Sequence, residues 1–289
     1  METRALGDFV IHALDGGGIR LDGGAMFGVV PKPLWERRAP PDDRNRIALA
    51  LRCLLVETGH ALVLVDTGVG DKESERFRDI YGVENAGDPT RLEDAIRAAG
   101  HSPDDIDLVV NTHLHFDHAG GNTRRAPGAP DGARAEPAFA RARYVVQREE
   151  FDFARRDNER IRASYLAPNY EPIAEAGRFE FLEGEVEVVP GVRALRTPGH
   201  TPHHQSILIE SGGERACFLA DLVPTVAHLA LPWIMGYDLE PLVTLESKRA
   251  VLGRARAEDW LLVFEHDPVT AWGRLDPASE RPQLASPPA

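Results

Sequence analysis

The stretch Thr112-His113-Leu114-His115-Phe116-Asp117-His118 places three imidazoles and one carboxylate within seven residues, directly after the mostly apolar run 106–110. Such a pattern is typical of a strand that ends in a loop, and a strand end can present several metal ligands from one rigid edge. His113 and His115 are two residues apart, so a tightly turned backbone can direct both toward one ion. Asp117 and His118 follow closely enough to hold a second ion. The alternative, a polar loop without metal, requires this clustering to be accidental in a chain with eleven histidines.

Three further candidate ligands stand at the ends of expected strands. His200 lies in a Pro-Gly turn after one strand, Asp221 closes a second, and His266 closes a third. Each alone is a weak signal, because a single histidine at a strand end is more often solvated than bound to a metal. Strands deliver their end residues to a common rim, however, so the three together with the first cluster indicate one metal site.

The composition is that of an ordinary globular protein, with 43% hydrophobic and 27% charged residues in a chain of 289. This length is enough to bury a large core. No segment resembles a linker, so we expect a single domain over residues 1–289. Residues 281–289 contain three prolines and little apolar content, which predicts a flexible tail.

The net charge of −13 argues against nucleic acids and anionic membranes as partners, because both are bound through accumulated Lys and Arg. The N-terminus lacks the apolar core of a signal peptide, and no run approaches the length of a membrane-spanning helix. We therefore expect a cytoplasmic protein without membrane contact. In that compartment Cys53 and Cys217 are expected to be buried, reduced thiols.

Short β-branched runs bounded by Gly, Pro or Asp recur along the chain and predict strands. Between them, hydrophobic periodicity predicts helices over 71–81, 89–99, 147–156 and 241–257. In the last helix the expected core positions are Leu242, Leu245, Ala250 and Leu252. Two groups of strands interleaved with helices indicate an α/β fold in which two sheets pack together with helices outside.

With these residues in this order, the chain resembles the metallo-β-lactamase superfamily from about residue 49 to His266. The resemblance implies a four-layer αβ/βα sandwich of two mixed β-sheets with outer helices. It also implies two metal positions that share one carboxylate. The first position would be held by His113, His115 and His200, the second by Asp117, His118 and His266, and Asp221 would bridge both.

The turn Leu64-Val65-Asp66-Thr67-Gly68 matches the early Asp-Thr-Gly turn of the superfamily. The resemblance implies that Asp66 orients metal ligands through hydrogen bonds, as such groups commonly do. The alternative is that Asp66 only forms the turn and does not contact the metal ligands. His204 is a second candidate for this orienting role, because it adjoins the loop that carries His200.

A pair of divalent cations about 3.5–4 Å apart would generate a bridging hydroxide able to attack an electrophilic carbon or phosphorus. Zinc suits imidazole and carboxylate ligands best, although iron, manganese and cobalt also fit. Asp221 would take part by holding both ions, and Asp117 could also pass a proton to the leaving group. Because the sequence has no Gly-x-Ser-x-Gly nucleophile motif, we expect metal-assisted hydrolysis.

Within the superfamily the chain looks most like the lactonases and related hydrolases of small molecules, the group that includes quorum-quenching enzymes. One departure concerns the substrate carbonyl. Acyl-homoserine lactonases usually carry a tyrosine three residues after the bridging aspartate, and this chain has Pro224 there. Assistance to the carbonyl would then come from another side chain, with His228 and Tyr237 as candidates. Ordinary packing is the alternative for both.

Two apolar segments are candidates for contact with a substrate or a partner. Met26 and Phe27 lie between glycines in 22–28, so this segment could form a loop that covers an apolar substrate. The alternative is that the side chains of Met26 and Phe27 fill the core. The segment 230–235 could form a second apolar wall or a dimer contact, and a homodimer is a possible assembly.

The sequence is also compatible with different activities of the superfamily. Thioester hydrolysis of the glyoxalase II type needs a basic helical region, for which 241–257 is a loose candidate. A mono-iron persulfide dioxygenase and a non-catalytic metal-binding protein stay open as well, and so does a phosphodiesterase, which the acidic charge disfavours. His115 occupies the position at which the flavodiiron oxidoreductases carry a glutamate, which favours hydrolysis over oxygen reduction.

Overall fold

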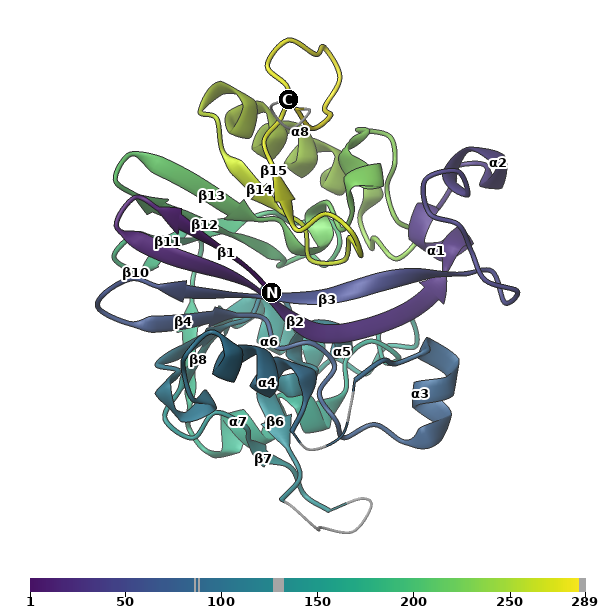
Figure 1. The fold of residues 1–289 in the computed structure, drawn as a ribbon. Helices are drawn as coiled ribbons and strands as arrows, with labels where there is room; N and C mark the ends of the chain where they lie inside the picture. The colour runs from purple at the N-terminus through teal and green to yellow at the C-terminus, as the bar shows by residue number, and fades with distance from the viewer. Residues whose placement is uncertain (86, 88, 127–132, 286–289) are drawn as a thin grey trace.

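The computed structural model describes residues 1–85, 87, 89–126 and 133–285 (Figure 1). In this part of the chain the strands form two large sheets and one small hairpin. The first sheet runs in the order β1 (Glu2–Leu6), β2 (Phe9–Asp22), β3 (Arg46–Glu57), β4 (Leu62–Val65), β5 (Leu108–Val110), β8 (Arg143–Gln147) and β9 (Phe179–Leu182). The second runs in the order β10 (Val186–Val189), β11 (Val192–Arg196), β12 (Gln205–Ser211), β13 (Glu214–Phe218), β14 (Leu261–Val263) and β15 (Trp272–Gly273). The hairpin pairs β6 (Thr123–Arg124) with β7 (Glu136–Pro137).

Both large sheets are mixed. β4, β5, β8 and β9 are parallel to one another, while β1 to β4 are antiparallel neighbours. In the second sheet the β13–β14 pair is parallel and the other pairs are antiparallel. The predicted α/β fold with two mixed sheets is therefore confirmed.

Helix α8 lies over the outer face of the second sheet, and α4, α6 and α7 lie below the first, whereas α1 and α2 lie at one end of β2 and β3 (Figure 1). The helix bounds are α1 (Gly23–Phe27), α2 (Lys32–Trp35), α3 (Glu75–Tyr81), α4 (Arg91–Ala98), α5 (Phe116–Ala119), α6 (Arg148–Ala154), α7 (Glu171–Glu175) and α8 (Pro241–Ala257). Buried residues of α4 pack on Leu55 and Leu64 of the first sheet, and those of α8 pack on Leu208 and Leu262 of the second. This is the predicted four-layer arrangement.

The inner faces of the two sheets meet in a shared core. Leu54 and Val65 from the first sheet pack in one cluster with Ile207, Phe218 and Val263 from the second. Each fully buried aliphatic or aromatic side chain contributes roughly 1.5–3 kcal/mol relative to exposure. This core therefore fixes the two sheets to each other, and with them any residues that their ends carry.

The predicted core face of α8 was wrong except at Leu252. Leu242 is 78% exposed, and the buried face is instead formed by Thr244, Lys248, Val251, Leu252 and Ala255. The reason is Lys248, whose ammonium donates to the carbonyls of His228 (2.7 Å) and Trp233 (2.8 Å), among others. A buried lysine with such partners sets the orientation of the helix, which hydrophobicity alone could not indicate.

Helix starts follow from capping residues. The helix predicted over 71–81 begins only at Glu75, because the Ser74 side chain accepts a hydrogen bond from the backbone of Phe77. Thr90 and Glu93 form a capping box at the start of α4. In the described residues both cysteines are free and buried, and no helix is long and apolar enough to cross a membrane.

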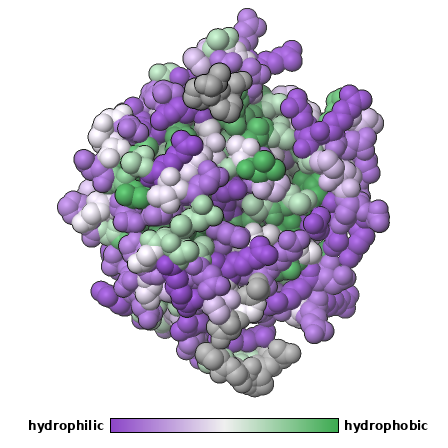
Figure 2. All heavy atoms as spheres, viewed as in Figure 1, coloured by the Kyte–Doolittle hydropathy of each residue, from purple (hydrophilic) through white to green (hydrophobic). Residues whose placement is uncertain are grey.

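The surface on the face viewed in Figure 1 is largely hydrophilic (Figure 2).

At the C-terminal end, Leu284 forms an isolated β-bridge with Leu275, and Ala285 donates to the carbonyl of Arg274 at 2.9 Å. The predicted flexible tail over 281–289 thus includes residues that hydrogen-bond to the fold, and its last four residues lie outside the described part of the chain.

Candidate metal centre

The residues 111–118, here called the histidine loop, continue from the carboxyl end of β5 in the first sheet. β5 lies between β4 and β8 and is parallel to both. The loop ends in the short helix α5, which contains Asp117 and His118. His113, His115, Asp117 and His118 are all buried.

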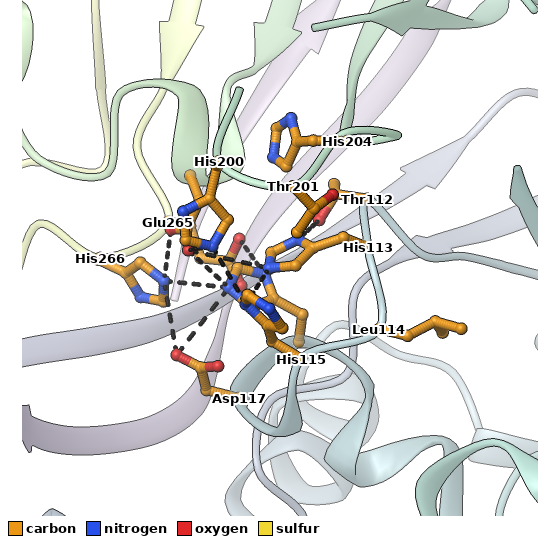
Figure 3. A network of polar contacts seen from close by, with 12 residues as sticks. Thr112, His113, Leu114, His115, Asp117, His200, Thr201, His204, Glu265 and His266 are labelled. Carbon is orange, nitrogen blue, oxygen red and sulfur yellow. Dashed lines mark hydrogen bonds and ion pairs between the residues drawn. The ribbon is translucent and has the colours of Figure 1, made fainter. Parts of the chain in front are cut away.

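The second sheet brings three more side chains to the same place. His200 follows β11, Asp221 follows β13, and His266 follows β14. Figure 3 shows the imidazoles of His200 and His266 directed toward those of the histidine loop, with Asp117 below them. The sheet ends therefore bring together the seven side chains that the sequence predicted as metal ligands.

One group consists of His113, His115, His200 and Asp221, whose ligand atoms all lie within 4.8 Å of one another. The Nδ1 atom of His115 is 3.0 Å from Nε2 of His113 and 3.1 Å from Nε2 of His200. The Oδ2 atom of Asp221 is 3.0 Å from Nε2 of His200. Three imidazoles and a carboxylate thus surround one point.

A second group consists of Asp117, His118 and His266. The Nε2 atoms of His118 and His266 are 3.3 Å apart, and Oδ2 of Asp117 is 3.9 Å from each. The other oxygen of Asp221, Oδ1, is 3.0 Å from Nε2 of His266. Oδ2 of Asp221 is also 3.4 Å from Nε2 of His118, so Asp221 faces both groups.

These distances fit a pair of divalent cations. Zinc–nitrogen bonds of about 2.0–2.1 Å in tetrahedral geometry place neighbouring ligand atoms about 3.3 Å apart. Asp221 Oδ1 accepts no hydrogen bond from any described residue, although it is buried. Burial alone would raise the pKa of Asp221, but His200, His118 and His266 hold the pKa of that carboxyl well below its usual range. A charged carboxylate among imidazoles, with one oxygen that accepts no hydrogen bond, is a donor set suited to metal ions.

The histidine ring nitrogens that face away from the centre have their own partners. His200 Nδ1 donates to Asp238 at 2.9 Å, and His266 Nδ1 donates to the carbonyl of Ala50 at 2.8 Å. His113 Nδ1 lies 3.1 Å from the Thr112 hydroxyl. These contacts fix each tautomer, so that Nε2 of each of these rings points to the centre.

Asp66 occupies the orienting position that the sequence predicted. It accepts hydrogen bonds from the backbone of Thr112 (2.8 Å), the hydroxyl of Thr112 (2.6 Å) and His118 Nδ1 (3.0 Å). Its φ of 54° lies in the left-handed region, which is uncommon outside glycine. Such strain is characteristic of functional sites.

His204 was expected to orient a metal ligand through a hydrogen bond, but its hydrogen-bond partner is Thr197. Its Nδ1 contacts the hydroxyl (2.9 Å) and the carbonyl (3.1 Å) of Thr197, and its Nε2 has no hydrogen-bond partner among the described residues. Its ring centre is 5.1 Å from that of His113. His204 therefore packs beside the first group, and Thr112 makes the hydrogen bond to His113.

A cavity of about 170 Å³ opens onto the two groups. Met26 and Tyr237, both predicted substrate contacts, line it. Phe27 and His228 do not. Phe27 is fully buried and stacks on His228 with ring centres 4.6 Å apart. His228 uses Nε2 to donate to the carbonyl of Met26 and Nδ1 to contact Thr225. The predicted substrate contacts of Phe27 and His228 were wrong, because both side chains fill the core behind the cavity.

Sequence reasoning missed several residues that support the site. Asp238, which orients His200, carries no recognisable signal in the sequence. Glu265 is fully buried with a carboxylate oxygen 3.1 Å from His118 Nδ1, and burial raises its pKa to about 8. A carboxylate between a buried strand and His266 was a usable signal. Glu150 is also fully buried and accepts hydrogen bonds from the backbone of Leu114 and the hydroxyls of Tyr165 and Thr201.

The site and fold can be compared with known proteins. A family model described as the metallo-beta-lactamase superfamily matches residues 49–266 of this chain. The chain belongs to this superfamily. The matched range contains all seven clustered side chains, from the histidine loop to His266.

Among superfamily members, an N-acyl homoserine lactonase from Bacillus thuringiensis is 30% identical over 229 residues, which cover 76% of this chain and 82% of that protein. Another, from a Bacillus species, is 34% identical over 170 residues, which cover 56% of this chain and 59% of that protein. The chain thus spans less than two thirds of the latter relative. The crystal structure of a probable metal-dependent hydrolase from Staphylococcus aureus is 31% identical, with a TM-score of 0.88 and coverage of 99% of this chain and 100% of that one.

Proposed function

We propose that this protein is a metal-dependent hydrolase that opens the ring of a lactone, most closely of the acyl-homoserine type. The observation that carries the proposal is the convergence of His113, His115, His200, Asp117, His118 and His266 around the two oxygens of Asp221. The similarity to N-acyl homoserine lactonases supports the choice of a lactone.

In this proposal His113, His115 and His200 would hold one divalent cation. Asp117, His118 and His266 would hold the other, and Asp221 would serve both. Zinc is the preferred metal, since it suits this ligand set. Two bound cations would supply Lewis acidity and an activated water. The residues of the chain keep this centre buried, with Asp66 and Asp238 orienting His118 and His200.

Asp117 lies at the boundary between the ligand cluster and the cavity. It belongs to the second group and also lines the cavity wall. Ring opening of a lactone breaks the bond between the carbonyl carbon and the ring oxygen, and that oxygen must gain a proton. A water molecule that adds to the carbonyl carbon gives up one proton. We assign to Asp117 the transfer of this proton to the ring oxygen, because its carboxylate reaches both the centre and the substrate space.

In acyl-homoserine lactonases a tyrosine usually stands at the position of Pro224 and assists the substrate carbonyl. In this chain Tyr237 can supply that hydroxyl instead. It lines the cavity, and burial raises its pKa to about 12, so its hydroxyl stays protonated at neutral pH. A protonated hydroxyl can donate a hydrogen bond to the carbonyl oxygen of a substrate. Replacement of Tyr237 by Phe should lower kcat by about 10- to 1,000-fold if this hydrogen bond forms in the transition state.

The cavity wall matches a small substrate with an apolar part. Leu21, Leu49, Ile161 and Met235 provide apolar lining, while Arg160 adds one cation. The thioesterase alternative loses one of the basic residues of its candidate region. Lys248 of α8 is buried and bound to backbone carbonyls, so it cannot serve a basic ligand-binding surface.

A panel of substrates combined with metal analysis tests the proposal. The zinc-loaded protein should hydrolyse acyl-homoserine lactones faster than thioesters, aryl esters or phosphotriesters, and should contain two metal ions per chain. Faster hydrolysis of thioesters, or oxygen uptake with a persulfide and one iron per chain, would refute it. The cytoplasmic location, the homodimer and the single domain over 1–289 remain predictions from the sequence.

A further inference from the structure

We propose that Arg52 is a positioning residue that holds His266 in place and thereby determines how tightly the second metal position retains its ion. The proposal rests on the two-ion site described above. It concerns β3, a strand that supplies no metal ligand itself but runs beside the loop that does.

The residues 264–267, here called the 264–267 loop, are bound to β3 through consecutive carbonyl groups. The Arg52 guanidinium donates to the carbonyls of Phe264, of Glu265 (3.4 Å) and of Asp267 (3.0 Å). The backbone N–H of Arg52 donates to Glu265 at 3.1 Å, and that of Ala50 donates to His266 at 3.1 Å. Every carbonyl of the 264–267 loop therefore has a donor on β3, and most of these bonds come from Arg52.

The same strand also orients the imidazole of His266. Its Nδ1 donates to the carbonyl of Ala50 at 2.8 Å, which directs Nε2 toward Asp221 and His118. Neighbouring residues of β3 therefore set both the position of the 264–267 loop and the direction of the His266 ring. Without the guanidinium, the carbonyls of Phe264, Glu265 and Asp267 on both sides of His266 would lose donors, so the loop that carries His266 would be held by fewer bonds.

The first metal position is supported by other residues. Asp238 binds His200, Thr112 contacts His113, and Glu150 binds both the histidine loop and Thr201. Loss of Arg52 should therefore weaken the second position and leave the first position unchanged. This selectivity separates a positioning role from a general contribution to stability.

The shape of arginine is essential to this role. Its planar fork presents several N–H groups in fixed directions, whereas a lysine ammonium is a single point charge. A cavity of about 320 Å³ adjoins Arg52 and is lined by Glu2, Asp15 and Arg91, among others. A free guanidinium compound can therefore reach the space that a truncated side chain would leave.

The experiment compares the zinc-loaded wild type with R52A, R52K and R178A, all as the full chain. Arg178 is the matched control, because its guanidinium also donates to two carbonyls, those of Phe139 (3.2 Å) and Ala140. Release of each zinc ion to excess chelator is followed, together with the visible spectrum of the cobalt-substituted proteins. R52A should lose one ion per chain about 10- to 100-fold more readily, as for other residues that orient metal ligands. The other ion should be retained as in the wild type.

R52K should lie between R52A and the wild type, R178A should retain both ions, and methylguanidinium below denaturing concentrations should slow the loss from R52A. Retention of both ions by R52A, or equal loss of both ions in R52A and R178A, would overturn the role of Arg52. A wild type that binds fewer than two ions would instead overturn the two-ion site, and this inference with it.

Discussion

Asp221 is the residue on which both proposed metal positions would depend, because its oxygens face different imidazoles at 3.0 Å each. Asn has the same shape but carries no charge and offers only one oxygen. Asp221→Asn should therefore lower both the metal content and the proposed lactonase activity, with the loss of activity following the loss of metal. Elemental analysis and rate measurements on one preparation check this. A variant with two ions and full activity would refute the bridging role.

Met26 and Phe27 are neighbours that are both buried in one hydrophobic cluster, but only Met26 borders the cavity, which makes them a matched pair. Phe27 is buried against Trp35 and His228, whereas Met26 lines the cavity. Phe27→Ala should reduce the free energy of unfolding by about 3–5 kcal/mol and leave the preference for acyl length unchanged. Met26→Ala should instead change KM for long acyl chains more than for short ones. Denaturant unfolding and a series of acyl lengths distinguish the two, and the reverse pattern would contradict this assignment.

At the scale of elements, Glu150 connects α6 to the histidine loop and to Thr201 beside His200. Burial raises its pKa above the ordinary value of 4.5. The folded protein thus binds this proton more tightly than the unfolded chain, so the contribution to stability is complete below pH 4.5 and is lost as pH rises through the folded pKa. In metal-free protein, the stability of the wild type relative to Glu150→Gln should fall as pH increases. Denaturant unfolding at several pH values measures the difference in free energy of unfolding between the two proteins. A difference that does not change with pH would argue against this pKa shift.

The sequence predicted the elements that follow local rules. The β-branched strands, the helix expected over 89–99 and the strand-end ligands each depend on residues close together in the chain. It did not predict the buried face of α8 or the surroundings of Phe27. Those depend on residues far apart in sequence, such as Lys248 with Trp233 and Phe27 with His228. Asp238 was missed for the same reason, because only the fold brings it to His200.

At the scale of the whole molecule, the candidate centre joins the two halves of the sandwich. The histidine loop comes from the first sheet, while His200, Asp221 and His266 come from the second. Ions bound between them would oppose separation of the sheets and would be lost on unfolding. A ligand that binds only the folded state stabilises it by about 2.7 kcal/mol when its free concentration is a hundred times its Kd.

Removal of metal should therefore lower Tm, and added Zn²⁺ should restore it in proportion to the logarithm of the free ion concentration. Calorimetry of the chelator-treated protein over a range of buffered Zn²⁺ concentrations measures this dependence. Asp221→Asn is the control, since it should show a smaller rise in Tm over the same range. If the wild type and Asp221→Asn respond equally, the stabilising zinc binds outside the candidate centre, because only ions held between the sheets depend on Asp221.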